Sequence, residues 1–569
     1  MKRTLGVLSA ALFVLFIPNL KHFNTAVIGS SGSDALKHVW SQWVVQHQLL
    51  SGNGLALHTN LLNFPYGGPF FSLDTVNAIL SLPLKIAIDS VASYNLTLVA
   101  CVGAAILAGS ALTRSINNDP WIPALGGVGF GITAWTLCFP LASGVSETAV
   151  TWPLPLVLLF SIRAWNSPGW LAPISAGFLL SLQGAACWSH GITAGLLLMG
   201  LFLSTWIANK QCLGDPYRLR RMLVLLSTVA LCSLPLYLAI SGTVSAEDAV
   251  KARTLSFFHS APIGPLAVPE ANSMALADFF SPGSWGRRVN TSGTEQLQYA
   301  AYPGFILIGL GILAIRDRLP WSRTLGVGVI LMALMSMGPR IYIDHARSIG
   351  GIPNPVYLTA YWLIPLVNAT IHSVDRFAVG LQLCLALLAA LGLSQIKIQH
   401  RPWILAAVFA EVIAISPGPW PLPMVQASAH PASLHIAKQS NGGAVIDLPF
   451  QRTGTEQAWF YGDIFLQQVT HQRPIPFQLE GHGMETASTP IADNRFFRNV
   501  SSGLIFGQPI VENCAGLDDL STLGVSWIVW HPQKAPANIR VDVDRALLSC
   551  LGEPQVFGDR KVFPLNPSP

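Results

Sequence analysis

Charge is what this sequence has least of. Only 11% of its 569 residues are Asp, Glu, Lys or Arg, while 51% are hydrophobic; an ordinary soluble domain has about a quarter of its residues charged. This composition excludes a soluble globular fold for most of the chain and indicates an integral membrane protein. The chain also lacks any tract of Lys and Arg with interleaved aromatic residues, so we expect no nucleic-acid partner.

Cysteine pairs of the CxxC form are absent as well, and the eight cysteines are scattered. This excludes the usual zinc and thiol-redox motifs. The sequence therefore predicts no cofactor and leaves a divalent metal open. Two cysteines, Cys514 and Cys550, lie in the polar C-terminal part, where they could form a disulfide if that part is exported.

Long apolar runs take the place of charge. A bilayer core about 30 Å thick is crossed by about 20 apolar residues in a helix, and such runs predict about eleven membrane helices. They lie near residues 4–20, 92–114, 120–140, 146–165, 169–187, 190–208, 221–241, 301–316, 321–338, 375–396 and 402–420. The first run has no small-residue cleavage site at its end, so we expect a retained helix rather than a signal peptide.

The positions of Lys and Arg predict the orientation. With the N-terminus in the cytoplasm, every cytoplasmic connection contains basic residues, whereas the short external turns 140–146 and 187–190 contain none. The apolar segment from Leu73 to Ile88 is then an interfacial or re-entrant helix, because one more span would invert all later connections. The long pieces face the periplasm of a bacterial inner membrane.

Two domains follow from these patterns. Residues 1–420 form a transmembrane domain with external loops 21–91, 242–300 and 339–374. Residues 421–569 form a C-terminal extracytoplasmic α/β domain, with strand-like stretches at 443–449, 524–530 and near 561–563,. The predicted fold class is an α-helical polytopic membrane protein with a small external α/β domain.

The stretch GSDALKHVW, which follows the first apolar run, groups an acid, a base and an imidazole. Asp34 is a candidate catalytic base; the simpler interpretation is that it only caps the helix that follows. Lys37 and His38 lie one turn away and could keep Asp34 ionised or relay a proton, or Lys37 could form a weak surface salt bridge with it. The Trp40, Trp43, Val44 and His47 stripe predicts a helix at the membrane surface.

Further candidates lie in the other external segments. Tyr66 is part of the turn-forming sequence NFPYGGP and could contribute an apolar wall,. Glu147 and His190 begin two predicted spans; each could bind substrate or make only local contacts. Arg376 precedes the tenth span and could bind phosphate or mark the interface. Arg287 and Arg288 could close over a lipid donor or contact headgroups.

In layout, the chain resembles the GT-C glycosyltransferases, the polytopic superfamily that includes protein O-mannosyltransferases and aminoarabinose transferases. The resemblance rests on one span followed by an acidic residue, a Trp/His helix and an N-x-P-x-G loop. It also rests on the short motifs GFGITAW (129–135), SHG (189–191), SVDRF (373–377) and GVSWIVW (524–530). A poorly characterised bacterial branch is the most similar.

The resemblance implies a transferase that takes a sugar from a polyprenyl-phosphate donor in the outer leaflet and passes it to a glycan, lipid or protein acceptor. Asp34 matches the position of the general base, and basic residues would hold the lipid phosphate. The chain departs from some members by having no second acid beside Asp34.

A second hypothesis is a non-catalytic transporter of lipid-linked saccharides or an assembly factor for envelope polymers. A transporter is expected to have polar residues within its spans, and often inverted repeats. The predicted spans contain almost no ionisable residues and no repeat is visible, which favours chemistry at the membrane surface.

Overall fold

The computed structural model describes residues 2–31, 33–55, 58–69, 74–208, 215–244, 272–280, 301–344, 351–364, 373–440, 442–449, 458–477, 489–506, 510, 514–535 and 537–565. The chain divides into two compact units. The helical unit comprises Met1–Ser30 and Leu73–Val425, and the mixed unit comprises Ser31–Ser72 and Gln426–Pro569. The first external segment, predicted to belong wholly to the transmembrane domain, is therefore divided between the two units.

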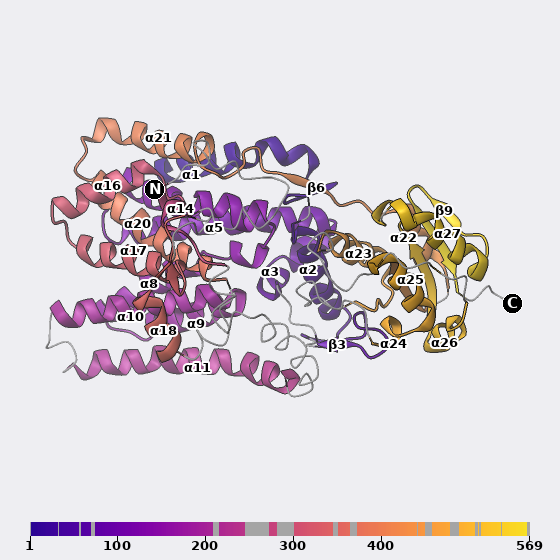
Figure 1. Ribbon diagram of the computed structural model, residues 1–569. Helices are drawn as coiled ribbons and strands as arrows, with labels where there is room; N and C mark the ends of the chain where they lie inside the picture. Colours follow the sequence, from indigo (N-terminus) through magenta and orange to yellow (C-terminus); the bar gives the residue numbers. More distant parts are fainter. Residues whose placement is uncertain are drawn as a thin grey trace. The chain divides into compact units, whose positions relative to one another are not determined.

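Long helices run side by side in the helical unit (Figure 1). They are α1 (Lys2–Phe16), α5 (Ser90–Arg114), α6 (Trp121–Gly131), α8 (Pro153–Asn166), α9 (Leu171–Ala186), α10 (Trp188–Ala208), α11 (Pro216–Val244), α16 (Phe305–Arg316), α17 (Ser322–Ser336), α20 (Ala378–Leu393) and α21 (Arg401–Ala414). Shorter elements connect them: η1 (Ile17–His22), β1 (Ala26–Ile28), α3 (Thr75–Leu80), α4 (Leu82–Ala87), α7 (Ala134–Thr136), η2 (Leu137–Ala142), η3 (Ser146–Ala149), α14 (Leu276–Phe280), β4 (Arg340–Ile341), β5 (Ile352–Pro353), α18 (Pro355–Leu363), η7 (Val374–Phe377) and η8 (Ile398–His400).

The predicted membrane helices are present. Among the described residues, seven helical stretches are long and apolar enough to cross a bilayer: Thr4–His22, Ser90–Arg114, Trp121–Ala142, Ser146–Asn166, Trp188–Ile207, Pro216–Leu236 and Val374–Leu393. The other four apolar runs form helices of 12 to 16 residues, α9, α16, α17 and α21. The prediction of an α-helical polytopic membrane protein is confirmed, with four helices shorter than expected.

The ambiguous segment from Leu73 to Ile88 forms two helices, α3 and α4, of six residues each. Six helical residues extend about 9 Å, so neither helix could cross the membrane. The break lies at Ser81, whose hydroxyl donates to the carbonyl of Asn77 at 2.6 Å, and Pro83 follows within the first turn of α4.

Glycine allows α5 and α6 to pack closely. A Cβ atom on Gly127 would lie 2.5 Å from the carbonyl oxygen of Ile106, and one on Gly131 would lie 2.4 Å from the Ile106 side chain. Membrane helices associate largely through such close contact, because lipid supplies no hydrophobic driving force between them. Gly131, within the GFGITAW motif, and Gly127, just before it, therefore have a packing role on the α5 side.

A buried carboxylate caps α16. Glu411 of α21, 5% exposed, accepts hydrogen bonds from the Tyr302 hydroxyl at 2.5 Å and from the backbone N–H groups of Phe305 and Ile306 at 2.6 and 3.2 Å. Those N–H groups have no partner within their own helix, and a negative charge there also complements the helix dipole.

We expect Glu411→Ala to destabilise the protein by about 2 kcal/mol or more, because several buried donors lose a charged acceptor. The measurement is the thermal unfolding midpoint of the purified protein in detergent. Trp403→Ala, on the same helix at a side chain that is 75% exposed, is the matched control. Equal midpoints for the two variants would contradict the capping role.

The mixed unit contains a four-stranded sheet in the order β7-β8-β10-β9. Its strands are β7 (Ala444–Leu448), β8 (Val525–Trp530), β9 (Gln555–Phe557) and β10 (Arg560–Pro564), and its helices are α2 (Ala35–Leu50), α22 (Pro431–Lys438), α23 (Ala458–His471), α24 (Thr489–Ala492), α25 (Arg495–Phe506), α26 (Leu517–Leu523) and α27 (Ala537–Leu551). The unit also contains a short hairpin of β2 (His58–Thr59) and β3 (Gly68–Pro69), and the turn η10 (Pro532–Lys534). Strand β6 (Met424–Gln426) leads from the helical unit into it.

The three predicted strands are confirmed. β7 pairs with β8 in parallel, with Ile446 opposite Ile528, and β10 pairs with β8 antiparallel, with Val562 opposite Val529. The edge strand β9 was not predicted, because its three residues carry no alternating pattern. Asp447 and His531 both lie near the carboxyl ends of their parallel strands, and the buried pair is joined at 2.7 Å.

Hydrogen bonds explain why Ser31–Ser72 belongs to this unit. The backbone N–H groups of Asn63 and Phe64 donate to the carbonyls of Phe477 and Ile475 at 2.9 and 3.1 Å. The Gln468 side chain of α23 donates to the carbonyl of Leu61 at 2.7 Å. The turn at residues 61–64 of the first external segment is thereby joined to the C-terminal part.

The stripe on α2 corrects one expectation. Trp40 and Trp43, predicted to lie at headgroup level, are 0% and 4% exposed. Trp40 donates from Nε1 to the Gln468 side chain at 2.7 Å and packs its ring 5.1 Å from that of Phe465. The apolar face is covered by protein, because α23 supplies both an aromatic contact and the acceptor that a buried indole needs.

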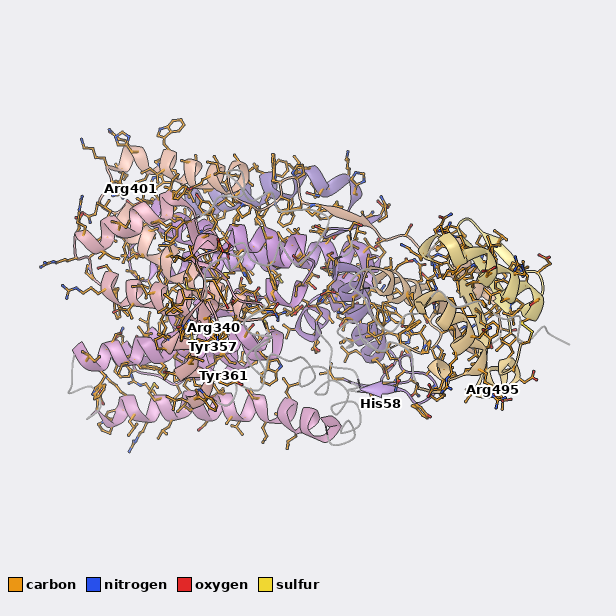
Figure 2. The ribbon with its side chains drawn as sticks, in the orientation of Figure 1. His58, Arg340, Tyr357, Tyr361, Arg401 and Arg495 are labelled. Atoms are coloured by element: carbon orange, nitrogen blue, oxygen red, sulfur yellow. A yellow bond between two sulfur atoms is a disulfide. The ribbon has the colours of Figure 1, made fainter. Side chains whose placement is uncertain are left out.

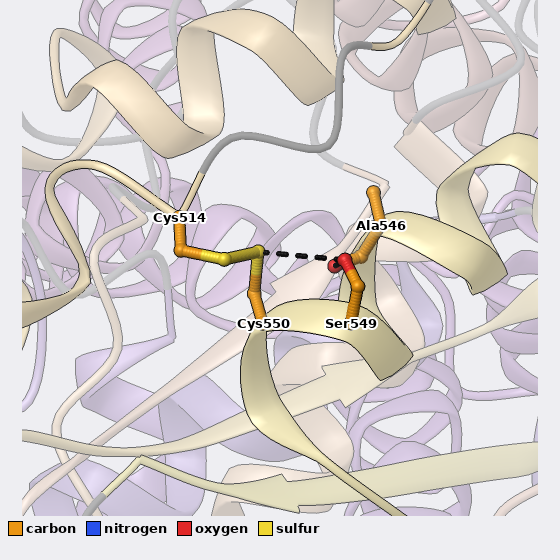
Figure 3. Close-up of a disulfide and its surroundings, with 4 residues drawn as sticks. All are labelled: Cys514, Ala546, Ser549 and Cys550. Atoms are coloured by element: carbon orange, nitrogen blue, oxygen red, sulfur yellow. Dashed lines mark hydrogen bonds between the residues drawn. A yellow bond between two sulfur atoms is a disulfide. The ribbon is translucent and has the colours of Figure 1, made fainter.

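A disulfide joins Cys514 to Cys550, the last residue but one of α27 (Figure 3). The bond links the residues that precede α26 to the C-terminal end of α27. The sequence left this pairing open, and the structure shows it.

His471, at the end of α23, is buried and neutral. Its Nδ1 accepts a hydrogen bond from the backbone N–H of Arg473 at 3.0 Å, which requires an unprotonated nitrogen. Burial is the main cause that lowers the pKa of His471 to about 4, with Arg473 adding to it and Asp447 opposing it.

This predicts an acid-sensitive mixed unit. The unfolded chain, with an ordinary His pKa of about 6.5, takes up a proton between about pH 6.5 and pH 4 that the folded state does not take up. Stability therefore falls as pH decreases through this window. We expect His471→Asn, which keeps an acceptor without a titrating ring, to lower the thermal unfolding midpoint at pH 7. Between pH 7 and pH 5, the midpoint of this variant should fall less than that of wild type. If both midpoints fell by the same amount, His471 would not be the cause of the acid sensitivity.

Candidate active site

Three of the predicted site residues meet in the helical unit. Glu147 lies in η3, His190 in the first turn of α10 and Arg376 in η7, immediately before α20. A guanidinium nitrogen of Arg376 lies 3.4 Å from Oε1 of Glu147. Glu147 is 8% and His190 0% exposed. In the predicted topology all three positions are at the external ends of their spans.

The third span is interrupted next to this site, and the interrupted segment contacts the charged residues. α6 ends at Gly131, Thr133 then caps α7 by accepting from the Thr136 N–H at 3.1 Å, and η2 continues as π-helix through Pro140. Irregular helical backbone at membrane depth is tolerated where protein covers it, and this stretch is almost entirely buried. π-Helical turns occur frequently at functional sites.

The interrupted segment places two aromatic rings under the charged residues. The rings of Trp135 and Phe139 stack with centroids 5.6 Å apart. The guanidinium carbon of Arg376 lies 5.5 Å from the Phe139 centroid, and the ring of His190 lies 5.6 Å from that of Trp135. A cation over an aromatic face is stabilised by the ring quadrupole, so Phe139 supports Arg376 from below.

Two neighbours complete the surroundings of Arg376. Cys187, 3% exposed, has its sulfur 3.9 Å from a guanidinium nitrogen, and the adjacent Asp375 is 1% exposed. Charges are costly away from water unless they are paired. Arg376 and the two acids Glu147 and Asp375 therefore stabilise one another through their opposite charges. The guanidinium has more than one acid near it.

Asp74 is the site residue that sequence reasoning missed. It is 2% exposed, precedes α3, and its carboxylate accepts from the hydroxyl of Ser146 and from the Asn77 side chain, the latter at 2.9 Å. Asn77 also donates to the carbonyl of Ser146 at 3.0 Å. Because Ser146 directly precedes Glu147, this network fixes the segment that presents Glu147.

The signal for Asp74 was present but weak. An Asp directly before a short apolar helix is typical of a helix start, and the segment was assessed only for its ability to cross the membrane. Carboxylate oxygens of Asp74 and Glu147 lie within 4.8 Å of each other. As oxygen ligands, two buried carboxylates at this separation could hold a divalent cation.

The remaining candidates lie in the mixed unit or outside the described residues. Asp34 is the N-cap residue of α2, without a side-chain cap bond; it lies 3.4 Å from Lys37, and its side chain is 45% exposed. His38 is buried and Tyr66 is 67% exposed. The turn predicted around Tyr66 is present, with the Asn63 side chain donating to the carbonyl of Gly67 at 2.8 Å. Arg287 and Arg288 lie outside the described residues.

Chemically, the cluster in the helical unit is suited to bind an anion. Arg376 offers a planar set of donors that matches phosphate geometry, and His190 adds an imidazole within the same group. Glu147 orients the guanidinium and prevents an uncompensated positive charge when no anion is bound. Asp34, by contrast, is solvent-accessible and lies 3.4 Å from the Lys37 ammonium.

Solved structures with a similar fold are membrane glycosyltransferases. The arabinofuranosyltransferase AftD from mycobacteria matches with a TM-score of 0.60 at 13% identity, over 100% of this chain and 40% of that chain. The archaeal oligosaccharyltransferase AglB from Archaeoglobus fulgidus, in complex with an inhibitory peptide and a dolichol-phosphate, matches with a TM-score of 0.52 at 13% identity, over 97% of this chain and 71% of that chain. The chain thus spans less than half the length of AftD. The sequence matches no family model and no curated protein.

A double-mutant cycle tests the coupling of Glu147 and Arg376. We expect Arg376→Gln to cost about 3 kcal/mol, because it leaves the buried Glu147 carboxylate without this guanidinium. Glu147→Gln should cost less, because the Arg376 side chain is 24% exposed and lies next to Asp375. The double variant should cost clearly less than the sum, since it removes both charges. The measurement is unfolding in detergent, and strictly additive costs would show that the pair is not coupled.

Proposed function

We propose that this chain, which has the GT-C-like fold of polytopic membrane glycosyltransferases, transfers a sugar from a polyprenyl-phosphate donor to an extracytoplasmic acceptor. The acceptor class is a glycan, a lipid or a protein. The proposed location is the bacterial inner membrane, with the N-terminus in the cytoplasm and the mixed unit in the periplasm. The membrane spans and the fold support a membrane enzyme of this class; the disulfide and the distribution of basic residues support the orientation.

The pair of half-buried Arg376 and buried Glu147 carries the proposal. When a sugar leaves its lipid carrier, negative charge accumulates on the phosphate oxygen that held it. A guanidinium that is already in position stabilises this charge strongly where water is excluded. Glu147 and the Phe139 ring hold Arg376 in place beforehand, so little reorganisation is needed during the reaction.

Asp34 is the proposed general base. The acceptor hydroxyl or amine attacks the anomeric carbon more readily if a carboxylate takes its proton as the new bond forms. The bond from the anomeric carbon to the carrier phosphate breaks, and the carrier leaves with the electron pair. Asp34 suits this role because its partial exposure leaves room for an acceptor and Lys37 lies 3.4 Å from its carboxylate.

The chemistry at the membrane surface agrees with these placements. Each charge would cost several kcal/mol in hydrocarbon, whereas the ends of helices provide fixed positions close to the headgroups. Asp74 supports the site by holding the segment before Glu147. Lys37, His38, Tyr66, Arg287 and Arg288 are proposed to contact donor or acceptor. No cofactor is proposed, and a divalent metal bound by Asp74 and Glu147 is left to experiment.

The test is sugar transfer in proteoliposomes supplied with a panel of undecaprenyl-phosphate sugars, measured as released undecaprenyl phosphate. We expect Asp34→Asn to lower kcat by on the order of 100-fold, the usual size of general-base catalysis. Arg376→Lys should lower kcat by a similar factor and raise KM as well, because the planar donor set is lost. Arg323→Gln, at an exposed arginine on α17, is the matched control and should retain activity.

The outcomes separate the parts of the proposal. Unchanged turnover in Asp34→Asn would remove Asp34 as the base while leaving Arg376 in place. Turnover insensitive to Arg376→Lys would remove the phosphate role. No release from any donor in the panel by folded wild-type protein would support the assembly-factor or transporter hypothesis instead.

A further inference from the structure

A cavity lies in the helical unit, between α1, α5 and α6. Its volume is about 600 Å³. Its lining residues are Thr4, Leu5, Leu8, Leu107, Ser110, Ala111, Arg114, Asn118, Pro120 and Pro123. Most of the lining is apolar, and among the described residues that form it Arg114 is the only charged one. The Thr4 hydroxyl donates to the carbonyl of Pro120 at 3.1 Å, so α1 is tied to the start of α6 beside the cavity.

This cavity is separate from the candidate active site. Arg114 is the last residue of α5, whose 25 residues extend about 37 Å. Arg376 lies before the first residue of α20. Arg401 (labelled in Figure 2), the first residue of α21, donates to the carbonyls of Ser394 and Ile396, which follow the last residue of α20. It also pairs with Asp119 at 2.6 Å. Asp119 and Arg114 thus belong to the opposite end of the bundle.

The charge of the cavity is positive. Asp119, the acid nearest in sequence to Arg114, is already paired with Arg401. In the described part of the chain no acidic side chain forms an ion pair with Arg114. A guanidinium at the rim of an apolar cavity therefore has capacity for an anion, and Ser110, Asn118 and Thr4 provide additional hydrogen-bonding groups.

The apolar wall continues onto the surface that faces lipid. Leu5 and Leu107 line the cavity and are 43% and 49% exposed, on helices long and apolar enough to cross the membrane. An occupant must therefore combine a hydrocarbon chain, which covers these leucines, with an anionic group close to Arg114. A soluble anion would leave the leucine wall uncovered, and a neutral lipid would leave the guanidinium without a partner.

We infer that this cavity binds an anionic phospholipid, with its phosphate at Arg114 and an acyl chain along Leu5, Leu8 and Leu107. The basic residues of the connections place this end of the bundle in the cytoplasmic leaflet, which commonly contains anionic lipids. The site is independent of the donor lipid, whose proposed phosphate ligand Arg376 is at the external ends of the helices. Bound lipid would hold α1 against α5 and α6.

Native mass spectrometry of the full-length protein tests this inference. The probes are dioleoylphosphatidylglycerol and, as the zwitterionic comparison, dioleoylphosphatidylcholine, each added to delipidated protein in detergent. We expect wild type to retain one phosphatidylglycerol at least tenfold more strongly than phosphatidylcholine. Arg114→Gln should remove this preference, and Arg323→Gln, an exposed arginine outside the cavity, should keep it.

A cavity-filling variant protects the test against misfolding. Ala111→Trp places an indole in the volume without altering Arg114 and should also abolish the tightly held lipid. A lipid preference that survives in both Arg114→Gln and Ala111→Trp, or that is lost equally in Arg323→Gln, would overturn the inference. Equal retention of the two lipids by wild type would overturn it too. None of these readings depends on sugar transfer.

Discussion

The contact between the Arg376 guanidinium and the Glu147 carboxylate is the interaction on which the helical unit's polar centre depends. A lone guanidinium in this apolar unit would be strongly unfavourable, and so would a lone carboxylate. Their pairing makes both tolerable and joins residues that are more than 200 positions apart in the sequence. Asp375, Cys187 and His190 all lie close to this pair, and Asp375 and Cys187 interact with it electrostatically.

The rest of the helical unit can be understood as the support of this pair. The interrupted third span places Phe139 beneath the guanidinium and Trp135 beside His190. The Asp74 network holds the backbone that precedes Glu147. Elsewhere the helices pack through glycine contacts and a carboxylate cap, which are the usual means of association in an environment without hydrophobic attraction between helices. Polar groups are thus concentrated in a few places, and each of these places joins two or more helices.

Several features were predictable because they depend on local or periodic properties. Apolar runs of membrane length predicted helices at every expected position, and alternation predicted three of the four strands of the sheet. Glu147, His190 and Arg376 were proposed individually because each stands at the start of an apolar run. Asp74 was missed because its importance comes from partners more than 70 residues away. The burial of Trp40 was mispredicted for the same reason: whether lipid or protein covers an apolar stripe is decided by which other helix is adjacent.

By itself, the sequence determined that the chain is a helical membrane protein with a small α/β part, because hydrophobic length and period are properties of consecutive residues. It also determined which residues are charged in a chain where charge is rare. Only the tertiary structure decided which of those charges meet, that Ser31–Ser72 joins the C-terminal residues, and that Cys514 bonds Cys550. Pairing across long sequence separations depends on the packing of whole helices and sheets, and no local pattern encodes it.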